Sequence, residues 1–165
     1  MFNLIIATDY EYGIGKENGI PWKCVKDLKN FKKVTDKNIV IVGRKTWETM
    51  PQDKILKTRI VIVVSKTMKD SKIHNLHIKP DLTEALKYGK CIKRNNEIYV
   101  IGGKRIYDES IENEELNEVY YTRIYGRYEC DVYVEKMGKI MKEWTIKEKK
   151  KYNECEIFIY VKNKK

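Results

Sequence analysis

One acidic residue lies on the apolar side of a short predicted helix. Residues 24–35 have the spacing of an amphipathic helix, and at about 100° per residue the apolar side chains share one arc: Cys24, Leu28, Phe31 and Val34. Asp27 lies inside this arc, where a carboxylate is costly unless a partner compensates for its lost hydration. Asp27 is therefore a candidate for proton chemistry or for binding a protonated or hydrogen-bond-donating ligand. The alternative is a carboxylate that accepts a bond from a backbone amide or a water.

Two predicted strands end in glycine and run directly into a helix. These turns lie within residues 40–46 and 100–107. A helix N-terminus presents unpaired N–H groups and the positive end of a dipole, and glycine lets a ligand approach the backbone closely. A single turn of this kind is commonly only a connection, but two on one sheet could bind the two ends of a dinucleotide.

The residues around these turns favour a dinucleotide that carries an extra phosphate. Neither turn is a G-x-G-x-x-G or a P-loop, and no acidic residue follows that could bind a ribose 2′-hydroxyl. Instead, Arg44 and Lys45 follow the first turn, and Ser65 and Lys66 follow the next strand. Cations at these positions fit a 2′-phosphate and would select NADPH over NADH. The alternative is that they are ordinary surface cations at strand ends.

Apolar strands alternate with helices along the chain. Strands are predicted at residues 2–8, 39–42, 59–64, 98–101 and 118–125, and an antiparallel pair at 144–150 and 154–161. Helices are predicted at residues 24–35, 44–50, 81–88 and 104–110, with loops at 9–21 and 51–57. This order predicts an α/β fold: a single domain, residues 1–165, whose central, mostly parallel twisted sheet is flanked by helices and ends in an antiparallel edge.

Size and composition fit one compact, globular domain. The chain has 165 residues and a net charge of +10, with its lysines spread along the sequence. We interpret them as a solvated surface that could steer anionic ligands, rather than as a nucleic-acid-binding patch. The four cysteines are far apart without a CxxC pair, so no metal site is predicted and reduced, structural thiols are expected. With no membrane-length apolar run and no signal-peptide pattern, a cytoplasmic location is expected.

Together these segments resemble the dihydrofolate reductase family over nearly the whole chain. Residues 14–22, Ile-Gly-Lys-Glu-Asn-Gly-Ile-Pro-Trp, are similar to the mobile active-site loop of that family. The other matching positions follow in the family's order and spacing: Asp27, Leu28, Phe31, Gly43-Arg44-Lys45-Thr46-Trp47-Glu48, Arg59, Ile101-Gly102-Gly103, Tyr107 and Thr122.

The resemblance implies reduction of 7,8-dihydrofolate to 5,6,7,8-tetrahydrofolate, which supports one-carbon and thymidylate metabolism and is the target of antifolates. Asp27 would bind the amino group and a ring nitrogen of the pterin, with Thr122 supporting it and Trp22 holding an ordered water. Arg59 would bind the glutamate α-carboxylate through a bidentate contact. The other residues implied around the substrate are Ile5, Ala7, Ile20, Leu28, Phe31, Met50, Leu56, Ile101 and Tyr107.

The resemblance also implies NADPH as the cofactor and a cis peptide between Gly102 and Gly103. The first turn, with Ser65 and Lys66, would bind the 2′-phosphate and part of the pyrophosphate, and the second turn would bind the rest and the nicotinamide end. The implied cofactor residues are Ala7, Ile14, Gly15, Asn18, Gly43, Arg44, Lys45, Thr46, Ser65, Lys66, Ile101, Gly102, Gly103, Lys104, Arg105, Ile106 and Tyr107.

The implied chemistry is hydride transfer from NADPH to C6, with N5 protonated through a water under the influence of Asp27. The loop around Ile20 would close over the rings and exclude bulk water. Two departures from the family pattern affect the pocket. The sequence Leu56-Lys57-Thr58-Arg59 lacks the Pro-Gly often found before the arginine, and Lys104 stands where a third glycine is common.

Two other functions remain as alternatives. A related NADPH-dependent pyrimidine reductase of riboflavin synthesis would use the same turns, but Asp27 with Arg59 matches the two ends of folate. A basic nucleic-acid-binding domain could use the aromatic and cationic residues of 120–128, although their alternation more simply gives one face to the core and one to water. We therefore expect a small-molecule substrate, antifolate inhibitors, no nucleic-acid or membrane partner, and a monomer.

Overall fold

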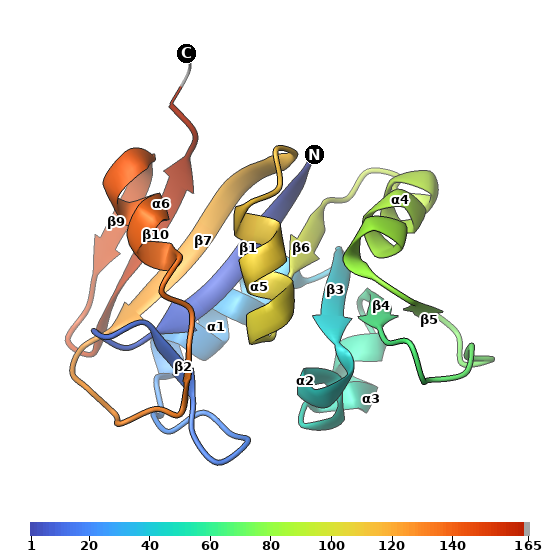
Figure 1. Ribbon diagram of the computed structural model, residues 1–165, viewed down its shortest axis with the longest axis horizontal. Coiled ribbons are helices and arrows are strands. Elements are labelled where there is room, and N and C mark those ends of the chain that lie inside the picture. Colours follow the sequence, from blue (N-terminus) through green and yellow to red (C-terminus); the bar gives the residue numbers. More distant parts are fainter. Residues whose placement is uncertain (164–165) are drawn as a thin grey trace.

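The computed structural model describes residues 1–163 and confirms the predicted sheet (Figure 1). Eight strands are arranged in the order β5-β4-β3-β6-β1-β7-β10-β9. Their bounds are β1 Phe2–Thr8, β3 Ile39–Gly43, β4 Ile60–Val64, β5 Leu76–Lys79, β6 Ile98–Val100, β7 Leu116–Ile124, β9 Thr145–Lys151 and β10 Cys155–Val161. Every pairing from β5 to β7 is parallel, whereas β10 is antiparallel to both β7 and β9. The antiparallel C-terminal edge therefore lies where it was predicted.

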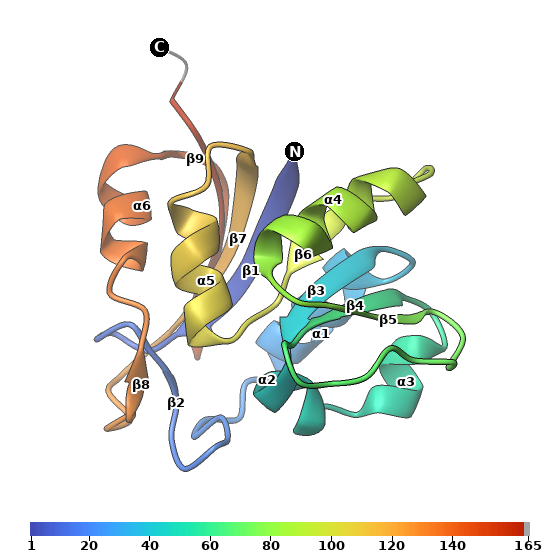
Figure 2. The same cartoon turned by 45° about the vertical axis from the view of Figure 1, so that its right-hand side comes forward.

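The helices cover both faces of this sheet. Figures 1 and 2 show α4 (Leu82–Ile92), α5 (Lys104–Ile111) and α6 (Met137–Glu143) over one face. The opposite face packs against α1 (Val25–Thr35), α2 (Arg44–Glu48) and α3 (Gln52–Leu56).

Alternate residues of the central strands enter two separate cores. In β3, Ile39 and Ile41 pack in the cluster with α4 and α5, whereas Val40 and Val42 pack in the cluster with α2 and α3. All four side chains are completely buried. A parallel strand that is covered on both faces needs apolar residues at every position, which explains the continuous β-branched run in the sequence.

Several local predictions were wrong. Residues 51–57 were expected to form a loop, but they contain α3, which begins after Pro51 and directs Ile55 into the core beside Trp47. The predicted loop 9–21 contains β2 (Gly13–Gly15), which pairs with β8 (Val132–Tyr133) in a small second sheet. The short elements β5, β8 and α6 were not predicted, and α4 extends beyond its predicted end at residue 88. The predicted start of α4 is confirmed, because Asp81 Oδ1 accepts a bond from the backbone N–H of Glu84 at 2.8 Å.

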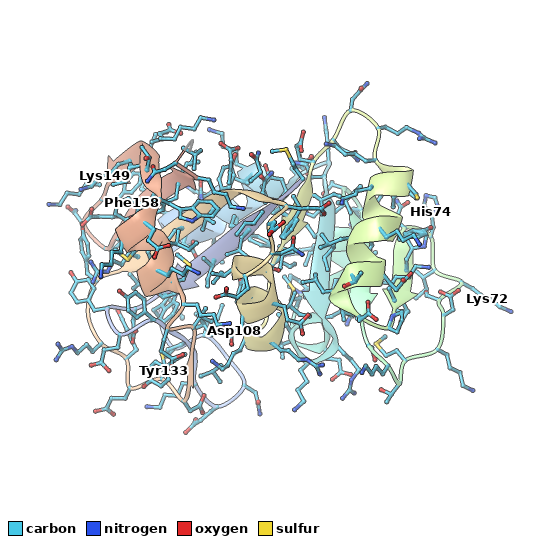
Figure 3. All side chains as sticks on the ribbon, turned by 45° about the horizontal axis from the view of Figure 1, so that its top comes forward. Lys72, His74, Asp108, Tyr133, Lys149 and Phe158 are labelled. Atoms are coloured by element: carbon cyan, nitrogen blue, oxygen red, sulfur yellow. The ribbon has the colours of Figure 1, made fainter. Side chains whose placement is uncertain are left out.

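The lysine-rich strand β9 forms one exposed edge of the sheet. All seven of its residues are exposed, and the ammonium of Lys149 lies 5.5 Å from the centroid of the Phe158 ring on β10. Figure 3 shows this pair at one end of the molecule, with Lys72 and His74 at the opposite end. Charged side chains on an edge strand disfavour pairing with another chain, so the cations of β9 have a structural explanation.

Candidate active site

The carboxyl ends of the parallel strands open into one large cleft, as is usual in open α/β sheets. Its volume is about 1430 Å³, which exceeds the range of about 300–1,000 Å³ typical of a pocket for one small ligand. The cleft borders the ends of β1, β3, β4 and β6, one side of α1, and the segment around β2. A cleft of this size can hold two ligands side by side.

Asp27 faces this cleft from α1. Burial raises the pKa of its carboxyl, and the neighbouring Thr122 hydroxyl partly offsets that rise. Thr122 itself is buried on β7 behind Asp27. On the apolar side of α1, Phe31 and Val34 pack against the core, whereas Leu28 borders the cleft and is 64 % exposed. Periodicity alone placed Leu28 on a core-facing side, but the side chain lines the cleft, where the family resemblance implies a substrate contact.

Arg59 lies at the end of the cleft near the C-terminus of α1. Its side chain is held by three hydrogen bonds: Nε donates to Thr35 Oγ1 at 2.9 Å, Nη1 to Thr58 Oγ1 at 2.9 Å, and Nη2 to the carbonyl of Lys32 at 3.3 Å. Burial lowers the pKa of the guanidinium, and the nearby Asp36 carboxylate opposes this shift. These contacts fix the planar donor group, which suits the binding of a carboxylate.

The cleft wall next to Arg59 differs from the predicted one. Ile55 lines the cleft, whereas Leu56 packs against the core and is not among the lining residues. The reason is α3, because a helical turn places neighbouring residues on different faces. The exposed side chains of Lys32, Lys54 and Lys57 also border this end of the cleft, so it is electropositive.

The two glycine turns lie against each other on the other half of the cleft. The backbone N–H of Gly43 donates to the carbonyl of Gly102 at 2.8 Å. The peptide between Gly102 and Gly103 is cis, as the resemblance implied. A Cβ on Gly103 would lie 2.9 Å from Thr46 Oγ1, and Gly102 has a φ of 121° that side chains rarely adopt. The absence of side chains here leaves backbone groups open to a ligand.

Four polar residues border this half of the cleft, where a phosphate was predicted to bind. Arg44 pairs with Glu48 on the next turn of α2 at 3.2 Å. Ser65 is turned toward its own loop, because its Oγ accepts bonds from the backbone N–H groups of Thr67 and Met68. Lys45 and Lys66 are exposed and form no ion pair within residues 1–163. Lys45 and Lys66 are therefore the cations most available to an anionic ligand.

Lys104 is directed away from the glycine turns. Its ammonium donates to the carbonyl of Tyr133 at 2.6 Å and forms ion pairs with Asp108 at 3.3 Å and Glu135 at 3.5 Å. Asp108 and Tyr133 are labelled in Figure 3, on α5 and on the nearby β8 segment. The departure at position 104 therefore links α5 to β8.

Tyr107 supports the same wall from inside the protein. Its hydroxyl lies 2.9 Å from the carbonyl oxygens of both Ile5 and Ile101, so it connects the ends of β1 and β6. Burial raises its pKa far above the ordinary tyrosine value.

All the predicted ligand-contacting residues border the cleft except Leu56 and Thr122.

Sequence reasoning missed Asp131. Its carboxylate accepts a bond from the backbone N–H of Glu17 at 2.9 Å, and its own N–H donates to the carbonyl of Gly15 at 3.0 Å. It therefore positions the loop that borders the cleft. Asp131 and Glu17 are 114 residues apart, and no local pattern indicates such a contact.

A family model described as dihydrofolate reductase matches residues 1–162. The chain belongs to the dihydrofolate reductase family. It is 33% identical over 177 residues to a dihydrofolate reductase of Pneumocystis carinii, covering 96% of this chain and 85% of that one. It is 35% identical over 148 residues to a dihydrofolate reductase of Schistosoma mansoni, covering 82% and 78% of the two chains.

A bifunctional dihydrofolate reductase-thymidylate synthase of Paramecium tetraurelia is 39% identical over 135 residues. The match covers 82% of this chain but only 28% of that protein. Membership of the dihydrofolate reductase family makes the chain an oxidoreductase, and it implies a nicotinamide cofactor and a small-molecule substrate.

Two other kinds of feature, a membrane-spanning helix and a metal-binding cluster, are absent from residues 1–163. No described helix is long and apolar enough to cross a membrane. Within the same residues, no three His, Cys, Asp or Glu side chains are grouped so that they could hold a metal ion. The thiols of Cys24, Cys91, Cys130 and Cys155 are all free, and Cys91 alone among these four is exposed.

Proposed function

We propose that this protein reduces 7,8-dihydrofolate to 5,6,7,8-tetrahydrofolate with NADPH. The observation that carries the proposal is that a half-buried carboxylate, Asp27, and a fixed guanidinium, Arg59, border the same cleft as the two glycine turns. These two groups suit the pterin and the glutamate ends of folate. Membership of the dihydrofolate reductase family supports the same substrate.

The cofactor half of the cleft fits NADPH. The paired turns at Gly43 and Gly102 offer backbone groups without side chains in the way, which suits a pyrophosphate. Lys45 and Lys66 are free to bind a 2′-phosphate. Bound there, NADPH supplies the hydride that reduces C6 of the substrate.

The task of Asp27 is to hold the pterin and to favour its protonation. Its carboxylate accepts hydrogen bonds from the amino group and a ring nitrogen of the pterin, while the neighbouring Thr122 hydroxyl favours the charged form of that carboxylate. The negative charge of Asp27 raises the basicity of the bound ring. A water carries the proton to N5, because Asp27 lies at a different part of the ring.

The remaining residues orient the rings and exclude bulk water. Apolar side chains of Ile5, Phe31 and Met50 border the cleft, so the pterin and benzoyl rings are held in a surrounding of low polarity. The loop that carries Ile14 and Ile20 covers the reacting rings when it closes. We expect the protein to act as a cytoplasmic monomer that antifolates inhibit, without nucleic-acid or membrane partners.

The direct test is to follow NADPH absorbance after dihydrofolate is added to the purified protein. Rapid oxidation that depends on both compounds is the expected result. A protein that binds NADPH but leaves dihydrofolate untouched would keep the cofactor half of the proposal and remove the substrate half. The pyrimidine reductase of riboflavin synthesis would then be the leading function.

The double variant Lys45→Gln/Lys66→Gln is expected to lose the preference for NADPH over NADH. Each charged contact to a phosphate contributes about 1.5–3 kcal/mol, so we expect the KM for NADPH to rise at least about tenfold, while the KM for NADH stays within about twofold. Steady-state kinetics with both cofactors will measure this. Lys29→Gln/Lys33→Gln on the exposed part of α1 makes the same change in net charge and should leave both values unaltered. An equal rise for both cofactors would contradict the proposed 2′-phosphate site.

A further inference from the structure

Two thiols that the proposed reaction does not use face each other beside the start of α1. The Sγ atoms of Cys24 and Cys155 lie 3.6 Å apart, and the thiol of Cys24 donates to that of Cys155. Both thiols are free, and their residues are 3 % and 0 % exposed. They are 131 positions apart in the sequence, so the fold brings them together. Two thiols at this distance can be oxidised to a disulfide.

Each thiol belongs to an element that supports the wall around Asp27. Cys24 precedes α1, three residues before Asp27. Cys155 begins β10, and Ile157 on the same strand is paired with Thr122 of β7, the neighbour of the Asp27 carboxyl. The thiol pair therefore lies between the helix that carries Asp27 and the strands behind it.

The turn between β9 and β10 brings this pair close to the protein surface. Oε2 of the exposed Glu154 lies 3.7 Å from Cys24 Sγ, and the Cys24 thiol is directed to it as a donor. The ammonium of Lys26 on α1 lies 5.1 Å from the centroid of the Tyr152 ring in the same turn. Glu154 can thus take the proton of Cys24, which is the thiol that a small reagent from solvent reaches first.

The second thiol is suited to a later step. Burial raises the pKa of the Cys155 thiol well above its ordinary value, and the Cys24 thiol and the Asp27 carboxylate raise it further. Since the thiolate is the reactive form, Cys155 reacts slowly with a reagent from solvent. Its sulfur is nevertheless in contact with Cys24, so its attack on an oxidised Cys24 is intramolecular and needs no collision.

We propose that Cys24 and Cys155 form a peroxide-sensitive dithiol that closes to a disulfide and thereby lowers the turnover of dihydrofolate. The Cys24 sulfur attacks one oxygen of hydrogen peroxide and the O–O bond breaks, which gives a sulfenic acid, while the leaving hydroxide takes up the thiol proton as water. The Cys155 sulfur then attacks the sulfenic sulfur, the S–O bond breaks, and hydroxide leaves with the Cys155 proton as a second water. Two thiols are thus oxidised to one disulfide, and one peroxide is reduced to two waters.

Closing the pair displaces the start of α1. A disulfide bond is about 2.05 Å long, so the two sulfurs must approach each other by about 1.5 Å. Buried side chains, among them Trp22 and Ile124, fill the space around the pair, so the movement is transmitted to the backbone. Asp27 lies in the first turn of α1, and a displacement of about 1 Å can cost about 100-fold in rate. This effect on turnover rests on the proposed function.

The test treats the reduced native protein with hydrogen peroxide, and catalase removes the excess before any assay. Peptide mass mapping identifies the disulfide, and turnover of dihydrofolate and the Kd for NADPH are measured on the same samples. We expect a disulfide between Cys24 and Cys155, a loss of turnover of at least about tenfold that dithiothreitol reverses, and a Kd for NADPH within about twofold of the native value. The glycine turns belong to other elements, which is why NADPH binding should persist.

Three results would overturn the inference. The first is the absence of this disulfide after peroxide treatment, and the second is a disulfide with undiminished turnover. The third is a disulfide that contains Cys130, a buried thiol of the same cluster that donates to the Asp9 carboxylate at 3.6 Å. None of these measurements needs a variant.

Two serine variants form a matched pair. Cys24→Ser removes one member of the dithiol, and serine is a favoured residue at the start of a helix. Cys91→Ser removes an exposed thiol on α4, away from the pair. Both variants should turn over dihydrofolate like the native protein before oxidation. After peroxide, Cys91→Ser should lose turnover as the native protein does, whereas Cys24→Ser should keep it; equal losses in the two variants would contradict the proposed disulfide.

Failure of the proposed function would be seen before any peroxide is added. A reduced native protein that leaves dihydrofolate untouched overturns the proposed function, and the effect of the disulfide on turnover with it. The mass map of the oxidised protein decides independently whether Cys24 and Cys155 pair. The two failures are therefore distinguishable.

Discussion

Replacing Asp27 with asparagine is expected to lower turnover of dihydrofolate by about 100-fold or more near neutral pH, the range for loss of a group that assists proton transfer. Asparagine keeps the size of the side chain and can accept one hydrogen bond, but it carries no charge to favour protonation of the bound pterin. Asp27 is the one acidic residue of α1, so no other carboxylate of that helix can replace it. Asp53→Asn on α3 is the control, because it removes one exposed carboxylate that does not border the cleft.

The pH dependence separates a proton role from a purely binding role. If N5 receives its proton from solvent, turnover by Asp27→Asn should increase steadily as the pH falls, because more of the substrate is then protonated before it binds. Turnover by the native protein should instead reach a plateau while Asp27 is still ionised. Stopped-flow measurement of hydride transfer over a range of pH will show this difference. A variant with the same fractional loss at every pH would indicate that Asp27 only binds the ring.

The same substitution is expected to stabilise the folded protein near neutral pH. Burial raises the pKa of Asp27 in the folded state above its value in the unfolded chain. The folded protein therefore holds this proton more strongly, and that contribution to stability is complete at acid pH and is lost as the pH rises through the raised pKa. Asparagine is neutral throughout, so the Tm of Asp27→Asn should exceed that of the native protein near neutral pH. Calorimetry should show the difference vanish at acid pH, where both side chains are neutral; a constant difference would contradict this explanation.

Those features that depend on near neighbours in the sequence could be predicted. The β-branched runs at Ile39–Gly43 and Ile60–Val64 indicated strands covered on both faces, and they are buried in the middle of the sheet. Asp27 was found because helical periodicity placed a charge among apolar residues. The glycine turns were found because strand, glycine and helix follow one another directly.

The contacts that position these groups could not be predicted in the same way. Asp131 accepts a bond from a backbone N–H more than a hundred residues away, and a carboxylate in a loop has no sequence periodicity that would indicate its partner. Periodicity identified the apolar side of α1 that carries Leu28, but it cannot show whether protein or a cleft lies beside that side chain. The segment 51–57 was read as a loop because α3 is only five residues long, too short for a helical pattern to develop.

Replacing Arg59 is expected to weaken substrate binding with little effect on the chemical step. Arg59 is 7 % exposed and borders the cleft away from the glycine turns. Loss of a buried, hydrogen-bonded partner of a carboxylate costs about 2–5 kcal/mol, so Arg59→Gln should raise the KM for dihydrofolate by about 100-fold. The kcat should change by less than about threefold, because the glutamate end of the substrate lies far from the reacting ring. Steady-state kinetics at saturating NADPH will measure both constants.

Further variants distinguish the contribution of the charge of the Arg59 guanidinium from the contribution of its fixed orientation. Arg59→Lys keeps the charge but not the planar pair of donors, so most of the rise in KM should remain. Thr35→Val leaves Arg59 in place and removes the Oγ1 that accepts from its Nε at 2.9 Å, together with the bond that this Oγ1 donates to the carbonyl of Phe31 at 2.7 Å. A rise of about tenfold in KM is expected if the bond to Nε fixes the guanidinium. Arg94→Lys, at an exposed position between α4 and β6, should have no effect. If Arg59→Lys restores the native KM, the charge alone binds the substrate, and Thr35 then has no part in recognition.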